Sequence, residues 1–218
     1  MLEEYIEVIK PHIIELFKED SSGHDIGHLI RTMNLALSIC DKENGDRLIV
    51  GIAAFMHDIH RIMQNECGHF VSPKDSLPKV REILSNTNLS SDIIEKICYA
   101  IEHHEEYSWS GNKVDDINTL ILQDADNLDA IGAIGIGRVF VYSSKNNIPM
   151  YDEEIPIDES DNYADEKNDP TSIHHFYHKL FKLGDNMNTN TAKKIAKKRI
   201  DFMKEYVDEF LNEWKGIL

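Results

Sequence analysis

Cysteine is scarce in this sequence, where only Cys40, Cys67 and Cys98 stand among 218 residues. An odd number of cysteines at such wide spacing forms neither a disulfide framework nor the paired spacing of a zinc knuckle. We therefore expect three reduced thiols, two of them in the core of helices. This excludes the small secreted proteins that disulfides hold together, and it favours a cytoplasmic protein.

Long apolar runs and positive charge are also in short supply. No uncharged run reaches the roughly 18 to 20 residues that a membrane-spanning helix needs. The first four residues, Met-Leu-Glu-Glu, lack the basic start of a secretion signal. Acidic residues (39) outnumber basic ones (23), which gives a formal net charge of -16. Such a surface repels nucleic-acid polymers and anionic membranes, so we expect neither as a partner.

No stretch alternates apolar and polar residues as a β-strand does; apolar residues recur at helical spacing instead. The sequence predicts an all-α fold of about eight or nine helices, a single-domain helical bundle over residues 1–218. We expect a motif-bearing core in residues 20–145 and C-terminal helices that pack on it in residues 171–216. The helices are expected near residues 2–19, 26–39, 49–56, 73–84, 91–104, 115–129, 130–143, 171–183 and 189–215.

Three segments break the helical pattern. Residues 62–72 and 105–113 each predict a loop, the first of them near the centre of the fold. Residues 148–170 form an acidic loop, which is either a candidate lid or a solvated surface excursion. Within residues 130–143, three glycines each weaken a helix by about 1 kcal/mol relative to alanine, which favours the close approach of another backbone or of a ligand.

The pair His57-Asp58 follows the apolar run of residues 49–56, which predicts a buried helix. Two titratable groups at the end of a buried helix cost free energy unless a partner satisfies them. A divalent cation does so, because neutral imidazole and carboxylate are its usual ligands. The alternative is that His57 donates a hydrogen bond to a carbonyl while Asp58 caps a helix or forms an ion pair.

Two further constellations favour the metal. His28 and Arg31 lie three residues apart on one helix face, and Asp126 stands in the acidic run 123–129 between positions that look buried. Two imidazoles and two carboxylates from three helices make a mixed nitrogen and oxygen site. Such a site suits one divalent ion, Mn, Mg, Co, Fe, Ni or Zn, with positions open for water. The absence of cysteine from the set argues against a closed structural zinc site.

In this order, His28, the doublet His57-Asp58 and Asp126 resemble the H…HD…D pattern of the HD-domain metal-dependent phosphohydrolase superfamily. The run Asp-Ala-Asp-Asn-Leu-Asp-Ala-Ile-Gly-Ala-Ile-Gly-Ile-Gly-Arg at 124–138, with residues 172–180, is similar to one bacterial branch of small stand-alone HD proteins. The resemblance spans residues 20–215. It implies an all-helical fold, a metal held by His28, His57, Asp58 and Asp126, and hydrolysis of phosphate esters or nucleotide phosphoanhydrides.

The resemblance also distinguishes between neighbouring candidates. It favours His28 over His24, because the family's first histidine stands in His-x-x-Arg. It favours Asp126 over Asp124, because the family's aspartate stands in Ala-Asp-x-Leu. His24 then supports the metal ligands from outside, and Asp25 either does the same or only caps a helix. Asp124 and Asp129 stay open between such a supporting role and a cap or surface carboxylate.

The sequence departs from the family at Arg61, since many relatives carry an acidic residue a few positions after the doublet. We expect Arg61 to bind a substrate phosphate; the alternative is a surface salt bridge. The pair His103-His104, followed by Glu105, resembles the two-metal branches, but no full second ligand set is evident, so we predict one ion. The expected catalytic residues are Asp58, Arg61 and His104, and the expected substrate-binding residues are Arg31, Lys74, His103, His175 and Lys179.

These residues predict a phosphohydrolase that uses metal-activated water on a small phosphorylated substrate, with a nucleotide as the leading class. Asp58 or Asp126 is expected to take the proton of the attacking water. One alternative is a non-catalytic nucleotide or metal sensor on the same fold, which the missing acidic residue favours. Another is a purely structural helical scaffold. The sequence fits a monomer or a homodimer.

Overall fold

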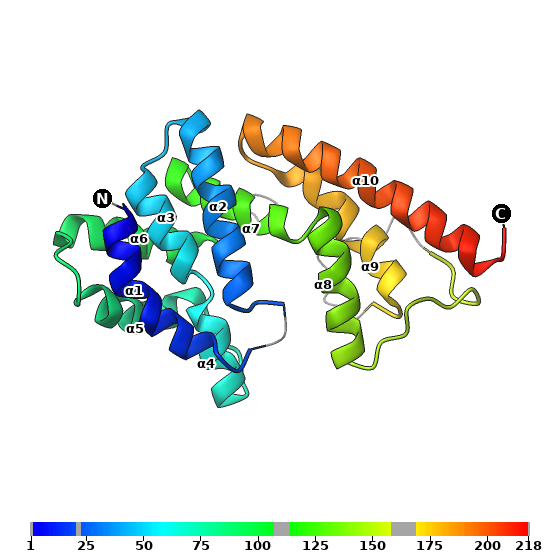
Figure 1. Ribbon diagram of the computed structural model, residues 1–218, viewed down its shortest axis with the longest axis horizontal. Helices are drawn as coiled ribbons and strands as arrows, with labels where there is room; N and C mark the ends of the chain where they lie inside the picture. The colour runs from blue at the N-terminus through cyan, green and yellow to red at the C-terminus, as the bar shows by residue number, and fades with distance from the viewer. Residues whose placement is uncertain (1, 21–22, 107–113, 158–168, 218) are drawn as a thin grey trace. The chain divides into compact units, whose positions relative to one another are not determined.

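The computed structural model describes residues 2–20, 23–106, 114–157 and 169–217. Within these ranges the chain forms helices and connecting segments and contains no β-strand, so the predicted all-α fold is confirmed (Figure 1). The chain divides into two compact units. The first comprises Met1–Asp126 with Asn188–Thr191, and the second comprises Asn127–Met187 with Ala192–Leu218. The predicted division into a core and packing C-terminal helices stays a prediction.

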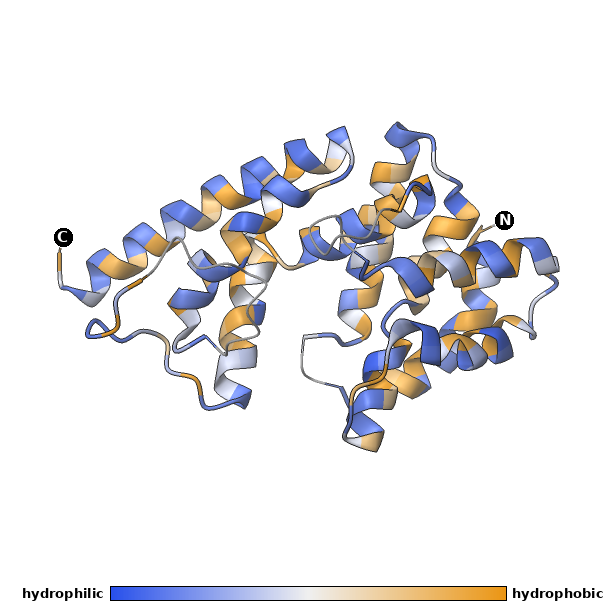
Figure 2. Cartoon of the chain, turned by 180° about the vertical axis from the view of Figure 1, so that it is seen from behind, coloured by the Kyte–Doolittle hydropathy of each residue, from blue (hydrophilic) through white to orange (hydrophobic). Residues whose placement is uncertain are grey.

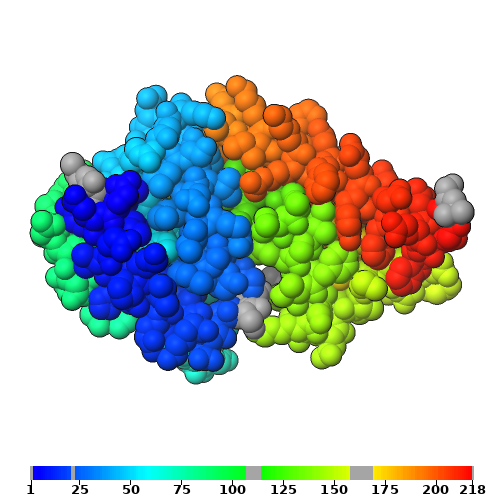
Figure 3. All heavy atoms as spheres, viewed as in Figure 1, coloured from blue at the N-terminus to red at the C-terminus, as the bar shows by residue number. Residues whose placement is uncertain are grey.

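The first unit is built around a helix that is apolar on every side. Helix α3 buries each residue from Ile49 to Met56, as the uncharged run predicted. Its one glycine, Gly51, leaves room for the side chain of Leu2, whose terminal methyl would lie 2.7 Å from a Cβ at this position. Figure 3 shows α1 and α2 covering one face of this unit. The helices are α1 Leu2–Phe17, α2 Ile26–Glu43, α3 Arg47–Met56, α4 Ile59–Cys67, the short 3₁₀ helix η1 Pro73–Ser76, α5 Leu77–Leu84, α6 Ser91–His103 and α7 Ile117–Asp129.

Polar side chains that precede the helices accept hydrogen bonds from backbone N–H groups of the first turn. Asp25 accepts a hydrogen bond from the backbone of His28, and Asp46 accepts from the first turn of α3. Ser90 caps α6 and Thr171 caps the later helix α9 in the same way. Each cap satisfies a backbone N–H that has no partner inside its own helix. The caps at Asp25 and Asp46 fix where α2 and α3 begin, and thereby where His28 and His57 stand.

The loop predicted at residues 62–72 is wrong over its first half. Helix α4 runs from Ile59 to Cys67 and ends at Gly68, whose φ of +73° is the left-handed conformation that suits glycine. The apolar pattern was too sparse to reveal this helix because one of its three buried positions is a histidine, His60. The doublet His57-Asp58 therefore forms the joint between two helices.

The C-terminal end of α7 and three further α-helices build the second unit. These are α8 Gly132–Lys145, α9 Ser172–His178 and α10 Asn190–Trp214, with the 3₁₀ helix η3 Leu180–Asn186. Polar and apolar residues alternate along α10, as Figure 2 shows. The helix predicted over residues 171–183 is broken, because Lys179 leaves the helical conformation (φ -121°, ψ -60°). An aromatic ladder packs this unit: Phe140, Phe176, Tyr206, Phe210 and Trp214.

The sequence analysis expected another backbone or a ligand to lie close to all three glycines of α8, and this holds for only some of them. A Cβ on Gly135 would lie 2.2 Å from the carbonyl oxygen of Ala130, so a backbone does come that near. Gly132 has a φ of +83° and faces the Arg199 side chain. Gly137 has open space around it, so the prediction is wrong there. The first two allow α7 to turn tightly into α8.

A short return segment, residues 188–191, belongs to the first unit although its flanking residues belong to the second. The buried carboxylate of Asp124 accepts hydrogen bonds from the backbone N–H groups of Asn188 (2.7 Å) and Thr189 (2.8 Å). Glu43 accepts one from Thr191 at 2.7 Å. Asp124 is therefore neither a helix cap nor a surface group.

Parts of two predicted loops, residues 107–113 and 158–168, lie outside the described residues. The expected lid is described only at its two ends. No helix among the described residues is both long and apolar enough to cross a membrane.

Candidate metal centre

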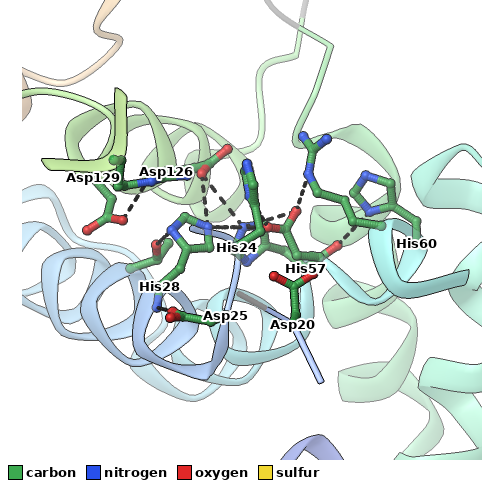
Figure 4. A network of polar contacts seen from close by, with 12 residues as sticks. Asp20, His24, Asp25, His28, His57, His60, Asp126 and Asp129 are labelled. Atoms are coloured by element: carbon green, nitrogen blue, oxygen red, sulfur yellow. Dashed lines mark hydrogen bonds and ion pairs between the residues drawn. The ribbon is translucent and has the colours of Figure 1, made fainter. Parts of the chain in front are cut away.

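Four side chains of the first unit meet where three helices end or begin. His57 follows α3, Asp58 precedes α4, His28 lies in the first turn of α2, and Asp126 projects from α7. Figure 4 shows the rings of His28 and His57 and the carboxylate of Asp126 directed toward one another. The side chains of both histidines are fully buried, that of Asp58 is 1% exposed and that of Asp126 is 16% exposed. The predicted meeting of two imidazoles and two carboxylates is present in the structure.

His28, His57 and Asp126 offer ligand atoms that all lie within 4.8 Å of one another, and Asp58 adjoins them through Oδ2 toward His28 and Oδ1 toward His57. His28 Nε2 lies 3.3 Å from His57 Nε2, 3.3 Å from Asp58 Oδ2 and 3.4 Å from Asp126 Oδ1. His57 Nε2 lies 3.6 Å from Asp58 Oδ1 and 3.7 Å from Asp126 Oδ1. His57 Nδ1 donates to the carbonyl of Ala54 at 2.9 Å, so in the neutral ring the lone pair is on Nε2. Two imidazole nitrogens that face each other need a proton or a cation between them, and this donor set fits a divalent ion.

The protonation states support this fit. Burial would raise the pKa of Asp58, but the charges of His57 and Arg61 and hydrogen bonds from His24 and His28 outweigh it, holding that pKa well below its usual range. Burial likewise opposes ionisation of Asp126, and contacts with His28 and His57 again hold the pKa low. Burial would lower the pKa of His57, yet Asp58 and Asp126 raise it. The ion-free centre thus attracts positive charge, which a divalent ion would supply.

Neighbouring side chains hold the candidate ligands in their orientation. His24 Nδ1 donates to Asp58 Oδ2 at 2.8 Å, which fits its predicted supporting role. Thr32 Oγ1 lies 3.4 Å from His28 Nδ1. Asp25 acts as the helix cap already described. Such outer contacts hold ligands in the geometry that a metal needs.

Arg61 bridges two carboxylates at the edge of the centre. Its Nε donates to Asp58 Oδ1 at 2.9 Å and its Nη2 donates to Glu105 Oε1 at 2.6 Å. Burial would lower the pKa of Arg61, but these carboxylates raise it. Burial would raise the pKa of Glu105, yet a hydrogen bond from His60 and the neighbouring His104 and Arg61 bring it down to about 2. The guanidinium is therefore a permanent charge between two ionised groups, with its side chain 35% exposed.

His104 lies inside this arrangement, whereas its neighbour His103 does not. The ring of His104 is fully buried and its centroid is 5.1 Å from that of His57. Burial and the charge of His57 lower the pKa of His104 to about 4, so it is neutral at physiological pH. His103 instead packs on Tyr99 at 4.3 Å and lies beside Glu106.

Sequence reasoning missed His60 and the position of Glu105. His60 is 2% exposed, its ring lies 5.6 Å from that of His104, and its Nε2 is 3.5 Å from Glu105 Oε1. The spacing from His57 to His60, three residues on contiguous helical turns, was the available signal. Glu105 follows α6, so a carboxylate reaches the doublet from a distant part of the sequence.

The other predicted residues are spread over both units. Arg31 is partly buried on α2, and Lys74 is an exposed lysine 3.0 Å from Glu102. In the second unit, His175 donates to Asp169, and Lys179 follows α9. Substrate binding by these four stays a prediction. For Asp129 the sequence left open a supporting role, a helix cap or a surface carboxylate. Its side chain is buried and paired with Arg138 at 3.0 Å, so it is not a surface carboxylate.

Comparisons with known proteins bear on the same residues. The family model for the HD domain matches residues 25–131, which include all four candidate ligands. The Bacillus subtilis protein YpgQ is 30% identical over 213 residues, covering 97% of this chain and 94% of its own. An HD-superfamily hydrolase from Bacillus thuringiensis has a TM-score of 0.75 and 31% identity over 99% of each chain. The structure of B. subtilis YpgQ in complex with ADP has a TM-score of 0.72 and 29% identity over 96% of each chain. With its helices, ligand order and relatives in agreement, this chain belongs to the HD-domain superfamily.

Proposed function

We propose that the protein is a metal-dependent phosphohydrolase that acts on a nucleotide. The observation that carries the proposal is that the buried Nε2 atoms of His28 and His57 each lie 3.3–3.7 Å from an oxygen of Asp58 and from Asp126 Oδ1, a donor set that suits a divalent ion. The relatives support the chemistry, since one is an HD-superfamily hydrolase and another binds ADP. The hydrolysed bond is then a phosphoester or a phosphoanhydride.

A divalent ion in this site would supply Lewis acidity toward water and a phosphoryl oxygen at neutral pH. The protein's own residues have distinct tasks. Asp58 and Asp126 are ionised and can accept a proton from water. Arg61 presents a guanidinium that matches phosphate oxygens. His104 is neutral, so its role is to position a group by hydrogen bonding, not to donate a proton as an acid.

A nucleotide sensor without turnover is the second candidate. This candidate is favoured by the pairing of Arg61 with Glu105. Paired in this way, Arg61 is less available to bind a phosphate, and Glu105 is less available to transfer a proton. Calorimetry that detects nucleotide binding by the metal-loaded chain, together with no release of phosphate or pyrophosphate, would select this candidate.

The deciding experiment is a nucleotide panel with Mn, Mg or Co added and with the products identified. Release of phosphate or pyrophosphate that requires the metal supports the proposal. Asp58→Asn should abolish both metal binding and release, while the matched variant Asp169→Asn in the second unit should keep the metal. Failure of every nucleotide, with metal content unaffected by Asp58→Asn, would refute it. A cytoplasmic location and the oligomeric state stay predictions.

A further inference from the structure

Helix α10 carries its charges in the order that stabilises a helix least. Residues 193–199 contain five basic residues and no acidic one, whereas residues 201–213 contain five acidic residues and a single lysine. The start of a helix has a partial positive charge and its end a partial negative charge, so basic residues near the start and acidic residues near the end are unfavourable. Stability of the helix therefore does not explain this order of charges.

The same charge is also repeated on successive turns of α10. Lys194 precedes Lys198 by four residues, and Glu205 precedes Glu209 by four. Like charges at this spacing repel each other across one helical turn and destabilise the helix. All four side chains are exposed, and none of them has a hydrogen bond or an ion pair with any residue in the described ranges. A single copy of the chain therefore leaves these four charges unpaired.

These four side chains share one face of the helix. At 3.6 residues per turn they lie within about 60° of one another around the helix axis. The opposite face is a line of buried residues, which comprises Ala192, Ala196, Ile200, Met203 and Val207. The outward face thus has a charge stripe, Lys194, Lys198, Glu205 and Glu209, that is positive over its first half and negative over its second. Figure 1 shows that α10 is one continuous helix, so the stripe is uninterrupted.

The charge stripe is complementary to itself when a second copy of the chain runs antiparallel. A two-fold axis between residues 201 and 202 brings Lys194 opposite Glu209 and Lys198 opposite Glu205, and symmetry repeats both pairs on the other side of the axis. Every repulsion within one helix is then accompanied by an attraction between the two helices.

The residues beside this axis fit the same arrangement. Phe202 is 49% exposed, and two copies of its ring would meet next to the axis and bury apolar surface there. Asp201 would face its own symmetry copy, but Lys197 already neutralises it at 2.7 Å within the helix. The axis therefore brings no unpaired like charges together.

A second copy fits this face better than a polymer of negative charge does. The chain carries a formal net charge of -16, so two copies repel each other over most of their surface. The charge stripe offers unlike charges in matched positions, which is where that repulsion is overcome. A nucleic acid or an anionic membrane drawn to Lys194 and Lys198 would meet Glu205 and Glu209 about two turns further along the helix.

We propose that α10 is a homodimer interface, in which two copies of the chain pack their α10 helices antiparallel through the charge stripe. The proposal rests on α10 alone and does not depend on the metal centre or on the proposed function.

Sedimentation of the full chain at several protein and salt concentrations tests this. We expect a reversible dimer whose dissociation constant rises as salt screens the pairs. Lys194→Glu with Lys198→Glu makes the stripe wholly acidic, and Glu205→Lys with Glu209→Lys makes it wholly basic. Each double variant turns every attractive pair into a repulsive one, so each should raise the dissociation constant at least about 100-fold.

The control for the acidic variant changes the net charge equally on other helices. Lys10→Glu with Lys42→Glu does so at exposed positions of α1 and α2 and should leave the dimer intact. Loss of the dimer in this control as well would assign the effect to net charge and overturn the interface.

Mixing the two double variants provides the sharpest test. A wholly acidic stripe faces a wholly basic one in the mixture, so we expect a heterodimer although neither variant dimerises alone. The four substitutions in one chain restore a self-complementary stripe, and that chain should dimerise as well. A native chain that is monomeric at every concentration would overturn the proposal, as would a dimer that both double variants leave unchanged. Failure of the mixture to associate would overturn it too, because ion pairing between two α10 helices requires that rescue.

Discussion

Two clusters in this chain contain the same kinds of side chain, imidazoles and carboxylates, but different ring nitrogens face the carboxylates in each. In the metal centre, the Nδ1 of His57 binds a backbone carbonyl and its Nε2 lone pair faces the acidic groups. In the second unit, Asp169 accepts from Nδ1 of both His175 (2.6 Å) and His178 (2.9 Å), and this set is the Asp169 cluster. There the ring proton already lies on the carboxylate side.

The difference shows which cluster requires an added cation. In the Asp169 cluster each carboxylate oxygen receives its own N–H donor, so its hydrogen bonds are complete without a cation, and its three side chains are 13–31% exposed. In the candidate metal centre, which is more deeply buried, the Nε2 atom of His57 and not its Nδ1–H faces Asp58 and Asp126. Identity of the side chains alone therefore does not mark a metal site; the nitrogen that meets the carboxylate does.

The strongest test of this contrast removes one carboxylate from each cluster. Asp58→Asn should lower metal affinity by at least about 100-fold, because an amide is a weaker ligand than a carboxylate and a buried pair is broken. Asp169→Asn should leave metal content unchanged. Elemental analysis after gel filtration measures both, and an equal loss in the two variants would contradict the comparison.

Loading the metal should stabilise the protein through the first cluster only. At an ion concentration 100 times Kd, binding adds about 2.7 kcal/mol to the free energy of unfolding, which corresponds to a rise in Tm of about 5–10 °C for a domain of this size. Thermal unfolding with and without a chelator measures the shift. The rise should disappear in Asp58→Asn and persist in Asp169→Asn; a shift that persists in both would place the ion elsewhere.

Acid should weaken metal binding through His57. Burial would lower the pKa of His57, but Asp58 and Asp126 raise it above its ordinary value of 6.5. In the ion-free chain this contributes stability below pH 6.5 that is lost as pH rises through the raised pKa. Metal binding displaces that proton, so affinity should fall by up to about tenfold per pH unit below the raised pKa. The increase in Tm on metal addition should accordingly grow from pH 5.5 to pH 8. An increase in Tm that is constant across this range would argue against His57 as a ligand.

The smallest expected effect comes from an orienting partner. His24 donates to Asp58 and its side chain is 32% exposed, so His24→Ala should weaken metal affinity by about tenfold with little loss of stability. His178→Ala, which removes the corresponding donor from Asp169, should leave metal affinity unchanged. Calorimetric titration of both variants compares them directly, and unchanged affinity in His24→Ala would remove His24 from the supporting set.

Structural features that depend on a few neighbouring residues were predictable from the sequence. The run before His57 marks a buried helix, and Asp25, Asp46 and Ser90 mark helix starts, because hydrophobic period and capping act over a few residues. The four candidate ligands were singled out because the family resemblance added the pairing of distant segments. Helices α2, α3 and α7 lie close to where the pattern placed them, whereas α4, which begins after Asp58, was not predicted.

Residues whose partners are distant in sequence were not predictable. Asp124 binds the backbone at residues 188 and 189, and nothing near Asp124 indicates this. His60 was missed because it lies at the start of α4, a helix that the sequence analysis did not predict. Glu105 was seen as part of a histidine motif, yet its contact with Arg61 spans 44 positions. Tertiary packing supplies such contacts, and local propensity does not contain them.

The return segment also limits how this protein can be dissected. The stretch that matches the HD-domain model ends at residue 131, but the N–H donors for Asp124 and Glu43 come from residues 188–191. A fragment cut at that boundary would keep a carboxylate in its interior and discard the groups that solvate it. The stretch defined by homology is therefore shorter than a self-sufficient folding module, and an engineer who wants the first unit alone must graft the four-residue return segment onto it.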